Sequence, residues 1–127
     1  MTTNQLLSLD VSVTDESPED ILTALKDVGA QNVKEVKQRG FTGIEIVVIG
    51  TLVANALANL IIRLTPLWKC GVIVDARGSR VLTKKDCDLP RGTVLVISPD
   101  GTQSKFHQPT ETDSGSLIKA FVGSKAG

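Results

Sequence analysis

The chain has 127 residues, which is enough for one compact domain that folds without help from a disulfide or a metal. Its 14 Lys and Arg balance its 14 Asp and Glu, so it lacks the basic surplus that a general nucleic-acid binder needs to displace counterions. Only 3% of the residues are aromatic, which leaves no stacking surface for single strands and predicts a core of Val, Ile, Leu and Ala.

The first third of the chain predicts a strand, a helix and a second strand. Residues from Leu7 to Val13 alternate between apolar and polar, as in a half-buried strand. Ser17 and Pro18 are typical of a helix N-cap and first turn, and the apolar residues between Ile21 and Val28 share one helix face. Residues 32–38 carry lysines that suit an edge strand, because charged side chains discourage further pairing.

The segment 46–62 contains no charged residue and is the most apolar part of the chain. The β-branched residues from Ile44 to Ile49 predict a buried strand, and a helix starting at Gly50 or Thr51 then continues until Pro66 stops it. The alternative is one helix over the whole stretch. Both hypotheses place Leu52 to Leu64 in a helix.

Short sequence patterns also predict the remaining elements. Residues 70–75 have the composition of a buried strand, and 79–90 form a charged surface excursion with a short strand at Val81 and Leu82. Residues 94–98 and 103–107 are joined by the turn sequence PDGT, which predicts an antiparallel hairpin.

These elements predict an α+β fold, a small two-layer sandwich with a ferredoxin-like (split βαβ) core, an added β-hairpin and a C-terminal helix. We expect a single domain over residues 1–108, a polar linker over 109–116 and a C-terminal helix or tail over 117–127. The apolar residues of the last segment either dock on the domain or are presented to a partner.

Cys70 and Cys87 are the two cysteines, and the N-terminus lacks the pattern of a secretory signal. We therefore predict a cytoplasmic protein with two buried thiols, although the cysteines could pair in principle.

Small residues recur every four positions at Gly50, Ala54 and Ala58, beside a polar stripe at Asn55 and Asn59. Such a face suits packing on a sheet, and it also suits self-association or a partner contact. A membrane span is the third hypothesis, which the cost of burying two Asn side chains disfavours.

The chain offers no recognisable catalytic, cofactor or metal motif. His107 could act only with a nucleophile such as Ser104 or Cys87 and an orienting acid, and no spacing favours that grouping. Neither a P-loop nor a G-x-G-x-x-G sequence occurs, and Asp86 with Asp88 falls short of a calcium loop. We predict no catalytic residue, no cofactor and no metal.

Three motifs together resemble the effector-associated constant components, a small family of bacterial conflict and defence systems. They are the opening strand and acidic helix (LDVSVTDESPEDILTAL), the apolar segment running into a helix (EIVVIGTLVANALANLIIRL) and the PDG hairpin (VLVISPDGTQSKFH). Residues 76–92 depart from the family pattern, which runs almost directly into the PDG turn. The resemblance implies a non-enzymatic adaptor that couples a sensor to an effector such as a peptidase.

The leading hypothesis is thus a protein-interaction or adaptor module that self-associates or binds a protein partner, and no nucleic acid. Docking would use the helix at 52–64, the hairpin edge or the C-terminal cluster. A membrane-acting effector that inserts residues 46–68 and a motif-poor enzyme using His107 are the alternatives. The candidate interaction residues are Gly50, Ala54, Asn55, Ala58, Asn59, Leu117, Ile118 and Phe121.

Overall fold

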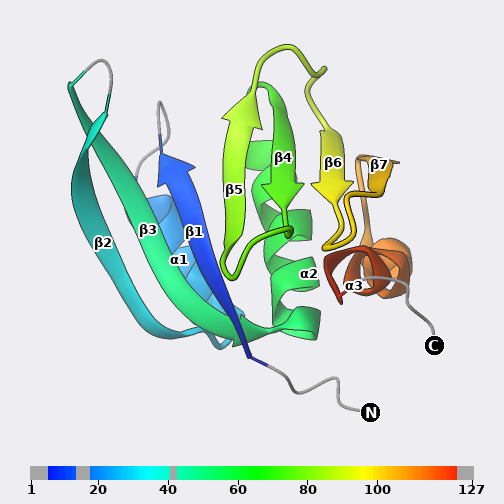
Figure 1. Ribbon diagram of the computed structural model, residues 1–127, viewed down its shortest axis with the longest axis horizontal. Coiled ribbons are helices and arrows are strands. Elements are labelled where there is room, and N and C mark those ends of the chain that lie inside the picture. The colour runs from blue at the N-terminus through cyan, green and yellow to red at the C-terminus, as the bar shows by residue number, and fades with distance from the viewer. Residues whose placement is uncertain (1–5, 14–17, 41–42, 123–127) are drawn as a thin grey trace.

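The computed structural model describes residues 6–13, 18–40 and 43–122, which form a seven-stranded mixed sheet with helices packed against it (Figure 1). The strand order is β2-β3-β1-β5-β4-β6-β7. The strands are β1 (Leu6–Val13), β2 (Gln31–Gly40), β3 (Gly43–Val53), β4 (Gly71–Asp75), β5 (Val81–Asp86), β6 (Thr93–Ile97) and β7 (Gln103–His107). The α-helices are α1 (Pro18–Asp27), α2 (Ala54–Leu64) and α3 (Ser114–Val122), with 3-10 turns η1 (Thr65–Leu67) and η2 (Glu111–Asp113).

The predicted elements of the first third are confirmed. Strand β1 pairs antiparallel with β3 from Leu6 opposite Val53 to Val13 opposite Ile46. Helix α1 buries Ile21 and Leu25. The predicted N-cap, Ser17, lies outside the described residues.

The boundary between strand and helix in the apolar segment differs from the prediction. Strand β3 continues through Gly50, Thr51 and Leu52, and α2 begins only at Ala54. The reason is long-range, because the pairing with β1 extends to the end of β3 and satisfies these backbone groups. A Cβ on Gly50 would lie 3.4 Å from Cγ2 of Val33 in β2, which is an ordinary van der Waals distance.

The short strand predicted at Val81 and Leu82 is present, but β5 extends to Asp86 and lies inside the sheet, whereas residues 79–90 were expected to form a surface excursion. Strand β5 pairs in parallel with β1 and antiparallel with β4. Val81 and Thr83 are buried, whereas Leu82 and Lys84, which alternate with them, are exposed. In a ferredoxin-like sheet the strand after the second helix lies beside the first strand, and β5 occupies that place here. The α+β class is confirmed, and the ferredoxin-like core is not.

The two cysteines are joined in a disulfide, so the prediction of two buried thiols is wrong. Gly71 lies opposite Asp86 in the last pair between β4 and β5, and this register brings Cys70 and Cys87 together just beyond it. Cys87 is exposed and Cys70 is half-buried. Because disulfides are rare in cytosolic proteins, this bond does not support the predicted cytoplasmic location, which stays a prediction.

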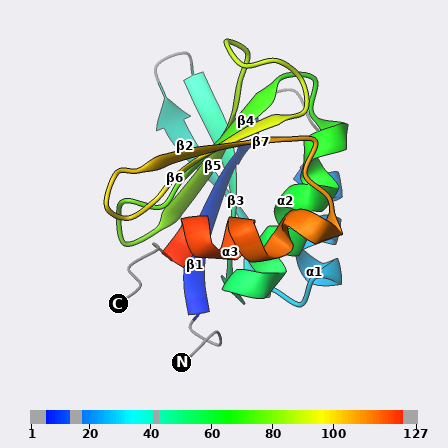
Figure 2. The same ribbon diagram turned by 90° about the vertical axis from the view of Figure 1, so that its right-hand side faces the viewer.

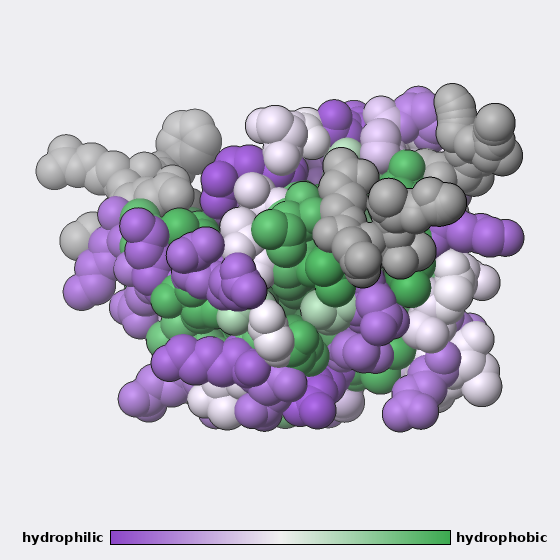
Figure 3. Space-filling model, turned by 90° about the horizontal axis from the view of Figure 1, so that it is seen from below, coloured by the Kyte–Doolittle hydropathy of each residue, from purple (hydrophilic) through white to green (hydrophobic). Residues whose placement is uncertain are grey.

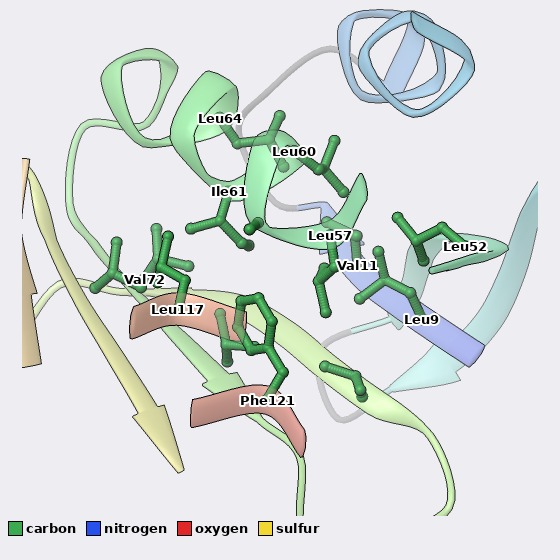
Figure 4. Packing of buried hydrophobic residues seen from close by; sticks show 14 of the residues in the cluster. Leu9, Val11, Leu52, Leu57, Leu60, Ile61, Leu64, Val72, Leu117 and Phe121 are labelled. Carbon is green, nitrogen blue, oxygen red and sulfur yellow. The ribbon is translucent and has the colours of Figure 1, made fainter. Parts of the chain in front are cut away.

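All three α-helices lie on the same face of the sheet, with α2 between α1 and α3 (Figures 1 and 2). In the core, Leu57 and Leu60 of α2 lie on the side of Leu9 and Val11 of β1, and Ile61 lies toward Val72 and Leu117 (Figure 4). From below, apolar residues gather in the middle of the molecule with hydrophilic residues around them (Figure 3). Burial of these side chains is the main source of stability.

The C-terminal cluster is a docked helix. Leu117 and Phe121 of α3 are 0% and 2% exposed and point into the core that α2 covers (Figure 4). Helix α3 starts inside the expected 109–116 linker, where Thr110 and Asp113 form a capping box at η2. Over the described residues, none of the helices is both long and apolar enough to cross a membrane.

Candidate functional site

The small residues that the sequence suggested as an interaction face are buried within the domain. Gly50 lies in β3 and not on the helix, so it does not continue a face formed by Ala54 and Ala58. The side chains of Ala54 and Ala58 are 3% and 0% exposed. Only Asn55 and Asn59 of this group face solvent.

The three C-terminal candidates are likewise occupied by intramolecular packing. Leu117 and Phe121 belong to the core, and Ile118 is half-buried against it. A partner could reach these side chains only if α3 left the domain. The sheet offers another surface, because none of the helices that the structure describes covers its second face.

His107 is not joined to the nucleophiles that the sequence offered. Its Nδ1 lies 3.4 Å from the hydroxyl oxygen of Thr93 on the neighbouring strand. Ser104 pairs with Val96 and lies on the opposite side of the sheet, and Cys87 is in the disulfide. No group of three His, Cys, Asp or Glu able to hold a metal occurs in the described part of the chain.

The uncovered face of the sheet mixes apolar residues with ion pairs. Across it, Asp10 lies beside Leu82, and Leu82 beside Asp75. Arg80 donates hydrogen bonds to Asp10, and Arg77 to Asp75 at 2.8 and 3.0 Å. The hydrogen bond from the Arg77 side chain lowers the pKa of the Asp75 carboxyl below its ordinary value. The half-buried or exposed apolar residues here include Ile49, Ile73, Leu82, Leu95 and Ile97.

The two edges of the sheet differ in how open they are to another strand. Edge strand β2 carries Lys34, Glu35 and Lys37, and its pairing with β3 has an irregularity between Gln31 and Lys34. Charges and bulges are two devices by which proteins block strand addition. Edge strand β7 has a single charged residue, Lys105, and regular pairing with β6.

The register shows which backbone groups of β7 face outward. Ser98 donates its N–H to the Thr102 carbonyl at 2.8 Å, and Gln108 donates its N–H to the Gly92 carbonyl at 2.7 Å. Because directly bonded pairs alternate along an antiparallel ladder, Ser104 and Phe106 also face β6.

The N–H and C=O groups of the remaining residues, Gln103, Lys105 and His107, therefore point to the outer edge. Figure 2 shows β7 as the last strand on this side, with α3 below it. The same three side chains are exposed, whereas those of Ser104 and Phe106 are half-buried. The arrangement is that of an acceptor for an added strand.

The hairpin edge was predicted as a docking region, but no residue of β7 was among the predicted interaction residues. The local signal was present, since a hairpin at the end of a sheet always leaves one strand with an unpaired side. What the sequence could not supply was the strand order that puts β7 at the edge.

No family model matches the chain, and neither a curated protein nor a solved structure was found to be similar to it.

Proposed function

We propose that this chain is a non-enzymatic adaptor that binds an extended segment of a partner protein along the outer edge of β7. The observation that carries the proposal is the row of outward-facing backbone groups at Gln103, Lys105 and His107. Strand addition satisfies such groups with main-chain hydrogen bonds, while side chains near the edge select the partner.

The charge at the centre of β7 favours an acidic partner over a second copy of this chain. An antiparallel pairing of two β7 strands over their full length would set Lys105 opposite Lys105 of the second copy. Like charges directly opposite each other destabilise a strand pair, whereas opposite charges stabilise it. We therefore assign the edge to a partner strand with Asp or Glu opposite Lys105.

The resemblance to effector-associated constant components adds a context to this proposal. In that context the partner is a sensor or an effector, such as a peptidase, of a bacterial defence system. The edge of β7 would bind either the sensor or the effector.

Selection of short random peptides on the immobilised protein tests the proposal, with fluorescence anisotropy of the enriched peptides as the measurement. We expect them to contain Asp or Glu among residues of high strand propensity. The Lys105→Pro variant removes one outward N–H without removing a hydrogen bond to β6, and we expect binding to weaken about tenfold or more.

Two further variants separate the backbone contribution from the charge. Lys105→Ala keeps the outward N–H and should weaken binding by roughly threefold, as expected for an exposed ion pair. Lys119→Ala removes an exposed lysine on α3 and should leave binding unchanged. Enriched peptides that bind Lys105→Pro as tightly as the wild type would contradict strand addition at β7.

A further inference from the structure

A pocket lies between the end of α2 and the far end of the β6–β7 hairpin, beyond the last residues of the proposed edge site. It has a volume of about 450 Å³, and its lining comes from three parts of the chain: Ile62, Thr65 and Pro66, then Arg91 and Gly92, and finally Gln108 and Pro109. This volume falls in the range of pockets that hold small ligands.

Arg91 supplies the charge of this pocket, and none of the acidic residues that the structure describes forms an ion pair with it. Its Nη2 donates a hydrogen bond to the Pro66 carbonyl at 3.1 Å, which holds the side chain against the opposite wall. The other arginines whose side chains the structure describes, Arg63, Arg77 and Arg80, each form an ion pair with an aspartate. A guanidinium has several N–H donors, so Arg91 keeps donors for a ligand.

The wall beside Arg91 has an unusual backbone. Gly92 has a φ of +88°, and Gln108 opposite it has a φ of 46°, a left-handed conformation that a residue with a side chain adopts at a cost. A Cβ on Gly92 would lie 2.9 Å from Cγ of Gln108, so only glycine lets the Gln108 side chain pack here. Strained backbone of this kind is concentrated at binding sites.

The chemistry of the lining selects among anions. A single guanidinium and a neutral Gln108 amide match one carboxylate, and nothing else in the lining would balance a dianionic phosphate. Thr65 adds no donor, because its hydroxyl donates to the Ile61 carbonyl at 2.6 Å. Ile62, Pro66 and Pro109 offer apolar contact to a short hydrocarbon body.

We infer that this pocket binds a carboxylate attached to a short apolar body, with Arg91 as the anion-binding residue and Gln108 as a second donor. The source of the carboxylate is either a free short-chain acid or the terminus of a peptide. This site does not depend on strand addition at β7, and either proposal can fail alone.

The test is an NMR titration of the ¹⁵N-labelled protein with hexanoate, followed at the backbone amides of Gly92 and Gln108. Hexanamide, which has the same body without the charge, is the ligand control. We expect saturable shifts with hexanoate, none with hexanamide, and binding at least about tenfold weaker in Arg91→Gln. Arg63→Gln, at an exposed arginine of α2, is the matched control and should bind hexanoate as the wild type does.

A short apolar peptide with a free C-terminus, compared with its C-terminal amide, identifies the source. Tighter binding of the free peptide than of hexanoate assigns the pocket to a partner's terminus, and the reverse assigns it to a small acid. If Arg91→Gln fails to fold, Arg91→Lys replaces it, and we expect weaker binding because the planar fork is lost. Equal binding of acid and amide, or unchanged binding in the Arg91 variants, would overturn the inference.

Discussion

Breaking the bond between Cys70 and Cys87 should lower the free energy of unfolding by about 3 kcal/mol, the chain-entropy value for a closed loop of this length. The two residues are separated by 17 positions, and the bond closes the loop that contains β4 and β5. In the unfolded chain this loop is held shut, which removes conformations that the reduced chain regains.

Urea unfolding followed by circular dichroism measures this loss, with and without a phosphine reductant. Because Cys87 is exposed, the reductant can reach the bond in the folded protein. A variant with Cys70→Ser and Cys87→Ser should show the reduced stability in both conditions, which controls for other effects of the reductant. A change below about 1 kcal/mol, or two reactive thiols in the folded protein under air, would refute the reasoning.

Three further predictions follow from the core and the ion pairs. Phe121→Ala should destabilise the protein by about 3–5 kcal/mol in urea unfolding, because the side chain is 2% exposed; an effect below about 1 kcal/mol would show that α3 does not dock. Ala58→Leu should cost about 1–3 kcal/mol without changing the mass measured by light scattering, since the added volume has to enter the core; dissociation of an oligomer would instead restore the interface hypothesis. Arg77→Ala should raise the pKa of the Asp75 carboxyl, measured by NMR titration, because the Arg77 hydrogen bond lowers it. A lowered pKa in the folded state stabilises the protein above the ordinary pKa of the carboxyl, and this contribution is lost as pH falls through the folded value. The variant should therefore lose part of the dependence of stability on acid pH, and an unchanged Asp75 titration would contradict the pairing.

Local patterns were sufficient where an element is defined by its own residues. The alternation from Leu7 to Val13 and the turn sequence at Pro99 predicted β1 and the β6–β7 hairpin, because each pattern reports burial and turn geometry directly. The buried strand before α2 was predicted for the same reason. Its extension to Val53 was not, because pairing with β1 overrides the small-residue spacing that suggested a helix from Gly50.

The full length and central position of β5 and the disulfide were missed for one shared reason. The alternation of Val81 and Thr83 with Leu82 and Lys84 covers few residues, and charges surround it. Its central position depends on pairing with β1, which is distant in the sequence. Had the β4–β5 pairing been recognised, its register would have put Cys70 and Cys87 opposite each other.

The binding surfaces depend on long-range geometry even more strongly. Helix periodicity suggested Ala58 as an interaction residue and an apolar cluster suggested Phe121, but both side chains lie in the core. The pocket joins Pro66 to Arg91 and Gln108, which no short motif connects. Only the hairpin edge was predicted from the sequence as a docking region and is also proposed as a binding site from the structure.

Amide hydrogen exchange along β7 tests the central proposal most directly, because it reports on each outward-facing backbone group. In the free protein the N–H groups of Gln103, Lys105 and His107 should exchange quickly, while those of Ser104 and Phe106 are protected by β6. When a selected acidic peptide binds, the first three should become protected as well. Protection of Lys105 in the free protein, or no gain in protection on binding, would contradict strand addition at this edge.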